Sequence, residues 1–198
     1  MTRTPASATE KVLHWSVAAA VLIMAGTGAV MYVPWLSQAV GQRFWVRAAH
    51  LAAALVFVLA LLLVPALRWT EIRRLERDLS FWEVADWDWF RRPWEVFASR
   101  YQPAAAPPGR FNGGQKLLAT LAATVLVLLL LTGVPMYWWG WFSGQLVARA
   151  RDLHVLAALG LAALLAGHVY LALFSPYGLL QGRFGPQAGL PTDRSETR

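Results

Sequence analysis

Long runs of apolar residues are the dominant pattern along this chain of 198 residues. Four such runs occur, at about 12–33, 45–66, 117–138 and 154–175. Each reaches the roughly 20 residues that a helix needs to cross about 30 Å of hydrocarbon. Backbone groups in lipid must be satisfied within the segment, which favours helices, and the ten-residue alternation of a membrane β-barrel is absent. The pattern predicts an all-α integral membrane protein, with a four-helix bundle in one domain over 1–175 and a cytoplasmic tail over 176–198.

The polar segment 67–116, between the second and third runs, is too long for a simple connection. It opens with arginine and glutamate and continues with aromatic residues mixed with acids and arginines, which is typical of helices lying at the lipid headgroups. The aromatic residues are Phe81, Trp82, Trp87, Trp89, Phe90 and Trp94. Prolines at Pro103, Pro107 and Pro108 then break any helix. We therefore expect one or two interfacial helices in the first part of this segment.

The composition agrees with a membrane location. Hydrophobic residues make up 57% of the chain and charged residues 15%, compared with about a quarter charged residues in soluble domains. The first apolar run, from Val12 to Val33, is longer than the roughly 7–15 residues of a signal-peptide core, so we expect it to be retained. The chain has no cysteine, which excludes a cysteine-ligated iron–sulfur cluster, a thioether-attached haem and a disulfide framework within it.

Lysine and arginine are distributed unevenly between the two sides of the predicted bundle. Fourteen of the eighteen lie before the first run, in 67–116 or in the tail. The other four, in or beside the two short connections, are Arg43, Arg47, Arg149 and Arg151. By the positive-inside rule, both termini and segment 67–116 are expected to face the cytoplasm. Topology and contact with lipid headgroups account for the basic charge, so no nucleic-acid partner is required.

All four histidines of the chain lie in or at the edge of the apolar runs. Ionisable groups in lipid are costly and usually have a partner or a function. A single one is most simply explained by a hydrogen bond to a neighbouring helix. With the predicted topology, however, His14 and His168 lie towards the cytoplasm, and His50 and His154 lie towards the outer side. The four residues therefore form two pairs matched in depth.

His154 and His168 are fourteen residues apart in one run. This step rises about 21 Å and returns to within about 40° of the same helix face. One helix would thus present a ligand in each leaflet, with His14 as partner of His168 and His50 as partner of His154. Two stacked bis-histidine haems are the arrangement that these positions permit. Zinc or di-iron would require carboxylates or cysteines, and the runs carry no acid except Asp152 at the outer edge.

A proton relay through histidines is the main alternative to haem, although a relay normally includes carboxylates. Four glycines would make room for a flat macrocycle, but close helix packing explains them equally well. They are Gly26, Gly28, Gly160 and Gly167. Three arginines lie where the propionates of an outer haem would need cations, but anchoring at the interface explains them equally well. They are Arg47, Arg149 and Arg151.

A weak internal repeat links the first and third runs. Residues 27–32 (TGAVMY) resemble residues 132–137 (TGVPMY), and a histidine follows the glycine at a distance of 22 residues in one case and 21 in the other. Duplication of a helix pair would produce this repeat, and chance is nearly as good an explanation.

Several short motifs together carry a resemblance to a known family. They are His14-Trp15, Thr27-Gly28, His50, Asp88-Trp89, segment 111–116 (FNGGQK), Thr132-Gly133, Asp152-Leu-His154 and segment 167–172 (GHVYLA). In these motifs the chain resembles the gamma subunit of membrane-bound respiratory formate dehydrogenase, a cytochrome b556, over about residues 10–175. FNGGQK is the most specific of them, and a histidine in an apolar helix is the least specific.

The resemblance implies two haem b groups with four histidine ligands. The pairs would be His14 with His168 on the cytoplasmic side and His50 with His154 on the periplasmic side. It also implies reduction of a quinone, menaquinone or ubiquinone, beside the cytoplasmic haem. The implied quinone residues are Asn112, Gly114, Gln115 and His168. Asn112 also suits a helix N-cap with Gln115 at the third helical position, and capping and quinone binding are compatible.

The resemblance further implies the partners. An iron–sulfur beta subunit on the periplasmic side would deliver electrons, and formate would be oxidised on a separate alpha subunit that contains molybdenum or tungsten. The complex could form a higher oligomer. This chain carries no candidate site for formate oxidation. Three alternatives stay open: the cytochrome b subunit of thiosulfate reductase, hydrogenase or another periplasmic oxidoreductase; a stand-alone reductase of the cytochrome b561 type; and a membrane scaffold or transporter whose histidines only brace helices.

Overall fold

The computed structural model describes residues 6–91 and 110–174, and every regular element within these ranges is a helix. The long helices are α1 (Ala8–Tyr32), α3 (Arg43–Leu67), α7 (Gly113–Tyr137) and α8 (Gly144–Phe174). All four are long and apolar enough to cross a membrane. The predicted all-α membrane bundle with four transmembrane helices is therefore confirmed.

Shorter helices occupy the connections. They are α2 (Pro34–Val40), α4 (Trp69–Ser80), α5 (Val84–Arg91) and the 3-10 helix η1 (Trp139–Trp141). Helices α4 and α5 confirm that the first part of segment 67–116 is helical, and their place at the membrane interface stays a prediction. The sequence analysis did not predict α2, which begins with Pro34 and ends at Gly41, whose φ of 66° lies in the left-handed region that favours glycine. The proline-rich stretch with Trp94, Pro103, Pro107 and Pro108 and the tail 176–198 lie outside the described residues.

All four long helices begin earlier than the apolar pattern indicates, and α8 does so by the most residues. Helix α8 begins at Gly144 rather than near residue 154, and α7 begins at Gly113 rather than at 117. Hydrophobic runs mark only the part of a helix that lies in hydrocarbon, whereas the hydrogen-bonded helix continues into the polar interface. The first turns of α8 carry Arg149 and Arg151, which shortened the predicted span.

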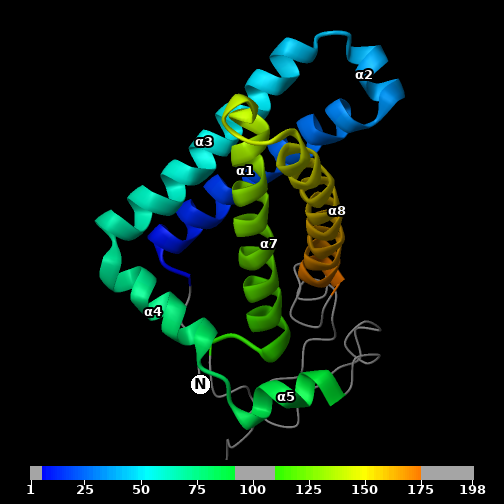
Figure 1. Ribbon diagram of the computed structural model, residues 1–198. Helices are drawn as coiled ribbons and strands as arrows, with labels where there is room; N and C mark the ends of the chain where they lie inside the picture. The colour runs from blue at the N-terminus through cyan, green and yellow to red at the C-terminus, as the bar shows by residue number, and fades with distance from the viewer. Residues whose placement is uncertain (1–5, 92–109, 175–198) are drawn as a thin grey trace, which may run out of the picture.

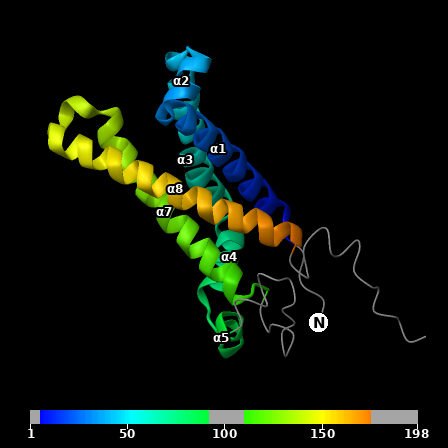
Figure 2. The same ribbon diagram turned by 90° about the vertical axis from the view of Figure 1, so that its right-hand side faces the viewer.

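The four long helices form two antiparallel hairpins, α1/α3 and α7/α8 (Figures 1 and 2). The hairpins cross at an angle, and the connections at α2 and η1 are splayed apart (Figure 2). Helices α4 and α5 lie at the other end, where Ser7 Oγ donates a hydrogen bond to Glu71 of α4 at 3.2 Å. Close backbone packing is concentrated within each hairpin, so contact between the hairpins is made mainly by side chains.

A small apolar cluster joins the hairpins halfway along the bundle. Its buried members are Ala20, Val21 and Phe57, and Leu126, Leu130 and Leu161 are among the residues packed against them. Phe57 comes seven residues, about two helical turns, after His50. Leu161 lies midway between His154 and His168 in α8. An apolar layer therefore separates the level of His50 and His154, here called the outer level, from the level of His14 and His168, here called the inner level.

Replacement of Phe57 with alanine is expected to loosen this layer, because its side chain is only 1% exposed. Such a substitution in a packed core costs about 3–5 kcal/mol of stability, because the lost transfer free energy adds to the cost of the cavity. Thermal unfolding in detergent would measure it. Leu62→Ala is the matched control, because Leu62 lies in the same helix and is 62% exposed. Equal destabilisation by the two variants would contradict this account of the apolar layer.

Candidate functional site

The structure brings the four histidines together as two pairs. The ring centroids of His14 and His168 are 6.1 Å apart, and those of His50 and His154 are 6.4 Å apart. His14 lies on α1, His50 lies on α3, and both of their partners lie on α8. Each pair therefore joins the α1/α3 hairpin to the α7/α8 hairpin. These are the same pairs that the depth argument predicts.

The ring separations fit an iron ion held between two imidazoles. A histidine nitrogen lies about 2.0 Å from its metal and about 1.1 Å from its own ring centre, so two axial histidines place their ring centres about 6 Å apart. The described residues contain no group of three or more His, Cys, Asp or Glu side chains that could hold a metal ion. A pair of histidines would suit haem iron, which is commonly held by histidine.

A threonine hydroxyl lies beside each outer histidine. Thr27 Oγ1 is 2.9 Å from His50 Nδ1, and Thr132 Oγ1 is 2.9 Å from His154 Nδ1. Each contact lies within one hairpin: the first connects α1 to α3, and the second connects α7 to α8. The sequence repeat at 27–32 and 132–137 therefore corresponds to a repeated contact between a threonine and a histidine. The sequence analysis found the repeat but did not predict this contact.

The glycines near the histidines fall into two groups. A Cβ added at Gly28 would lie 3.7 Å from Cε1 of His50, and one added at Gly133 would lie 3.8 Å from Cε1 of His154. At the other three predicted glycines, nothing in the described structure lies within 4 Å of an added Cβ apart from the chain neighbours and the backbone of the same helix; these are Gly26, Gly160 and Gly167. Close helix packing, the alternative explanation, therefore does not account for these three.

The arginines expected near the outer level have exposed side chains. They are Arg47, Arg149 and Arg151. Arg151 approaches Asp152 at 3.7 Å, with both side chains largely exposed. Such a pair contributes little to stability, so the Arg151 guanidinium can also meet lipid headgroups or another anionic group.

At the inner level, an ion pair connects α1 to the chain that precedes α7. Arg110 donates to both carboxylate oxygens of Glu10, with 2.6 Å between Nη1 and Oε1. Glu10 also completes the capping box with Ser7 at the start of α1. The hydrogen bond from Arg110 to Glu10 raises the pKa of Arg110 above its ordinary value, so the guanidinium stays charged. Glu10 lies one helical turn before His14, which brings the start of the FNGGQK segment near the inner histidine level.

The FNGGQK segment forms the start of α7. The Gln115 backbone N–H donates to Asn112 Oδ1 at 2.9 Å, and the Asn112 N–H donates to Gln115 Oε1 at 3.1 Å. The predicted N-cap is thus confirmed as a reciprocal capping box. Both side-chain oxygens accept backbone hydrogen bonds, and within residues 6–91 and 110–174 neither NH2 group has a partner. Each amide can therefore still donate to a carbonyl group of a ligand.

A buried ion pair fixes α5 against the first turn of α7. Lys116 is 3% exposed, and its Nζ donates to Asp86 Oδ2 and to the Phe81 carbonyl, each at 2.6 Å. A Cβ added at Gly113 would collide with the backbone carbonyl of Asp86. The first glycine of the segment is therefore required by helix packing. The sequence analysis missed this contact, since the two charges are thirty residues apart in different helices.

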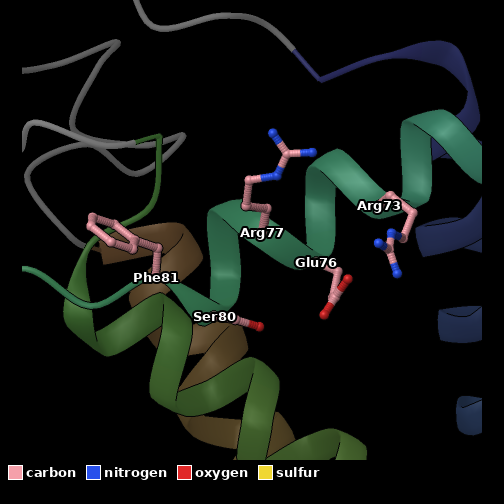
Figure 3. Close-up of a pocket in the computed structure, with 5 residues that line it drawn as sticks. All are labelled: Arg73, Glu76, Arg77, Ser80 and Phe81. Atoms are coloured by element: carbon pink, nitrogen blue, oxygen red, sulfur yellow. The ribbon is translucent and has the colours of Figure 1, made fainter.

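Two hollows lie near α4 and α5. One is polar and is lined by Arg73, Glu76, Arg77, Ser80 and Phe81 (Figure 3). Arg77 points to the opposite side of α4 from Glu76 and Ser80, as expected for a helix exposed to headgroups (Figure 3). The other is apolar and is lined by Trp82, Trp87, Phe90 and Leu117. None of the four histidines lines either hollow.

Comparison with known proteins gives a consistent set of matches. Residues 6–182 match the family described as prokaryotic cytochrome b561. The chain is 28% identical over 189 residues to the formate dehydrogenase cytochrome b556 subunit of Haemophilus influenzae, a match that covers 91% of this chain and 74% of that protein.

Two proteins of Escherichia coli (strain K12) are also similar. The formate dehydrogenase cytochrome b556(fdo) subunit is 28% identical over 174 residues, covering 85% of this chain and 77% of that protein. The nitrate-inducible cytochrome b556(Fdn) subunit is 24% identical over 183 residues, covering 88% and 80% respectively. These matches confirm the resemblance carried by the short motifs.

Proposed function

The chain belongs to the prokaryotic cytochrome b561 family, and from this we propose that it binds two haem b groups and passes electrons across the membrane to a quinone. The observation that carries the proposal is the pair of ring separations, 6.1 and 6.4 Å, each joining the two hairpins. His14 and His168 would be the axial ligands at the inner level, and His50 and His154 those at the outer level.

The fold provides what two such sites need. Haem iron with two histidine ligands supplies one-electron chemistry. Helix α8 carries one histidine of each pair, His154 and His168. These two residues are about 21 Å apart along the helix axis, because they are separated by fourteen residues with a rise of about 1.5 Å each. The apolar layer around Phe57, which is 1% exposed, keeps water out between the two levels.

We propose that the quinone binds at the cytoplasmic end, beside Asn112, Gly114 and Gln115 and close to His168. Two observations support this position. The capping box leaves the NH2 groups of Asn112 and Gln115 as donors for a quinone carbonyl. The ion pair of Arg110 with Glu10 links the same segment to the helix that carries His14. Protons for the quinol would enter from the cytoplasm.

We further propose that the chain is the membrane subunit of a formate dehydrogenase complex in the bacterial inner membrane, with both termini in the cytoplasm. The similar proteins named as formate dehydrogenase subunits support this assignment. The uneven distribution of lysine and arginine supports the orientation. An iron–sulfur subunit and a molybdenum or tungsten subunit would lie on the periplasmic side. Purification of the native complex and identification of its subunits tests the assignment.

The family name also favours a second candidate, a cytochrome b561-type reductase that acts without soluble subunits. The same purification separates the two. A chain that purifies alone and accepts electrons from small donors would support the second candidate. Recovery with subunits of another periplasmic oxidoreductase, such as hydrogenase or thiosulfate reductase, would keep the electron path and change the donor.

Substitution of the two amides tests the quinone site. Asn112→Asp and Gln115→Glu preserve the capping box, since Asp is a good N-cap and Glu suits the third helical position, but each removes an NH2 donor. The loss of one hydrogen bond of about 1–1.5 kcal/mol is expected to slow quinone reduction about tenfold.

Stopped-flow oxidation of the reduced protein by a soluble quinone analogue would measure this rate. The thermal stability of both variants should stay close to that of the parent protein, because the caps are intact. A parental rate of quinone reduction in both variants would refute the proposed site.

A further inference from the structure

We propose that Thr27 and Thr132 are positioning residues for the outer histidine pair. Each hydroxyl would hold its histidine as the tautomer with hydrogen on Nδ1, which leaves Nε2 free to bind iron. The inference rests on the proposed role of His50 and His154 as haem ligands and adds a second layer of residues to that site.

The hydrogen of each threonine hydroxyl is already used within its own helix. Thr27 Oγ1 donates to the Ile23 carbonyl at 2.6 Å and lies 3.2 Å from that of Met24. A hydroxyl has one hydrogen and two lone pairs, whereas a carbonyl oxygen can only accept. Towards His50 Nδ1, at 2.9 Å, the Thr27 oxygen must therefore be the acceptor. The hydrogen of that bond lies on His50.

The same arrangement occurs at the other hairpin. Thr132 Oγ1 donates to the Leu128 carbonyl at 2.7 Å and lies 3.2 Å from that of Leu129. It is 2.9 Å from His154 Nδ1, so this nitrogen also carries the hydrogen. Two separate hairpins thus give the same donor and acceptor pattern. A neutral imidazole with hydrogen on Nδ1 has its lone pair on Nε2, which is the form that binds a metal.

A hydrogen bond at Nδ1 does more than select a tautomer. In metal sites it fixes the orientation of the ring and raises the basicity of the ligating nitrogen. A more basic ligand favours ferric over ferrous iron. The two hydroxyls therefore are expected to lower the reduction potential of the outer haem.

The inner pair lacks this device in the part of the chain that the structure describes, where neither His14 nor His168 has a hydrogen-bond partner. The two levels therefore differ in whether a hydrogen bond fixes the orientation and tautomer of the histidine rings. This difference gives an internal control, because a change at Thr27 or Thr132 should alter the outer site and leave the inner one unchanged.

The test uses the full haem-loaded protein with Thr27→Val, Thr132→Val and the double variant. Valine preserves the shape of threonine and removes the hydroxyl oxygen that accepts from Nδ1. Each substitution is expected to shift the reduction equilibrium of the outer haem towards the reduced form by about threefold to tenfold, where tenfold corresponds to 59 mV for one electron. Redox titration followed by absorption measures the shift. The serine variants keep the hydroxyl and should restore the parental value.

The outcomes separate this inference from the proposed function. A parent protein that lacks two haems would refute the proposed function itself. A parent protein with two haems, and valine variants whose outer potential is unchanged, would overturn only the role of the threonines. Loss of thermal stability without a change in potential would also overturn it, because the hydroxyls would then serve only the helix backbone. If the double variant fails to assemble, the single variants and their serine counterparts decide the question.

Discussion

Replacement of His154 with alanine is expected to remove the outer haem and leave the inner one. The protein would then hold one haem in place of the proposed two. Because His50 and His154 share one site, with ring centroids 6.4 Å apart, His50→Ala should abolish the same spectral component. His14→Ala and His168→Ala should instead abolish the other component, since their rings are 6.1 Å apart at the inner level. Transmembrane electron transfer should fall to below about one hundredth, because about 21 Å is left without a carrier.

Haem content and reduced-minus-oxidised spectra of the purified variants would measure these losses. Thr124→Val is a suitable control, because within residues 6–91 and 110–174 this hydroxyl bonds only to its own helix, to the Thr120 carbonyl at 2.9 Å. A ring separation near 6 Å is also typical of two aromatic rings that merely pack together. If the histidines only brace helices, alanine at any of the four positions would leave both spectral components in place. That result would refute the haem assignment.

The sequence predicted most of the fold because membrane burial leaves a direct trace in it. Hydrophobic runs revealed the four long helices, and the mixture of arginine and tryptophan after the second run indicated α4 and α5. Asn112 and Gln115 formed the cap that their residue types favour. Depth alone was enough to group the histidines, because each run fixes the depth of its residues.

Contacts that depend on helix rotation could not be predicted in the same way. The repeated Thr-Gly pair was visible in the sequence, but its hydroxyls face His50 and His154 only because of how each hairpin packs. The pairing of Lys116 with Asp86 depends on the position of α5, which no pattern specifies. The predicted start of α8 came about ten residues too late, because the first turns of this helix carry arginines and do not form part of the hydrophobic run.

Asp86→Asn is expected to destabilise the end of the bundle that carries α4 and α5 by about 3–5 kcal/mol, because it leaves a buried ammonium without its counter-charge. The side chains of Lys116 and Asp86 are only 4% and 6% exposed. Lys116→Met should have a similar effect, since it leaves the carboxylate alone. The double variant Asp86→Leu with Lys116→Met should be more stable than either single variant, because apolar pairs often replace buried ion pairs without loss.

Chemical unfolding in detergent, analysed as a double-mutant cycle, would measure the coupling between the two residues. Asp152→Asn is the control, since the Arg151–Asp152 pair is exposed and its loss should change stability by no more than about 0.5 kcal/mol.

The Lys116–Asp86 pair also holds the turn that carries Asn112 and Gln115. In Asp86→Asn, quinone reduction should therefore slow while the outer haem keeps its spectrum and potential. Additive single effects in the cycle would contradict a coupled ion pair. An unchanged rate of quinone reduction in Asp86→Asn would show that the Lys116–Asp86 pair does not support the quinone site.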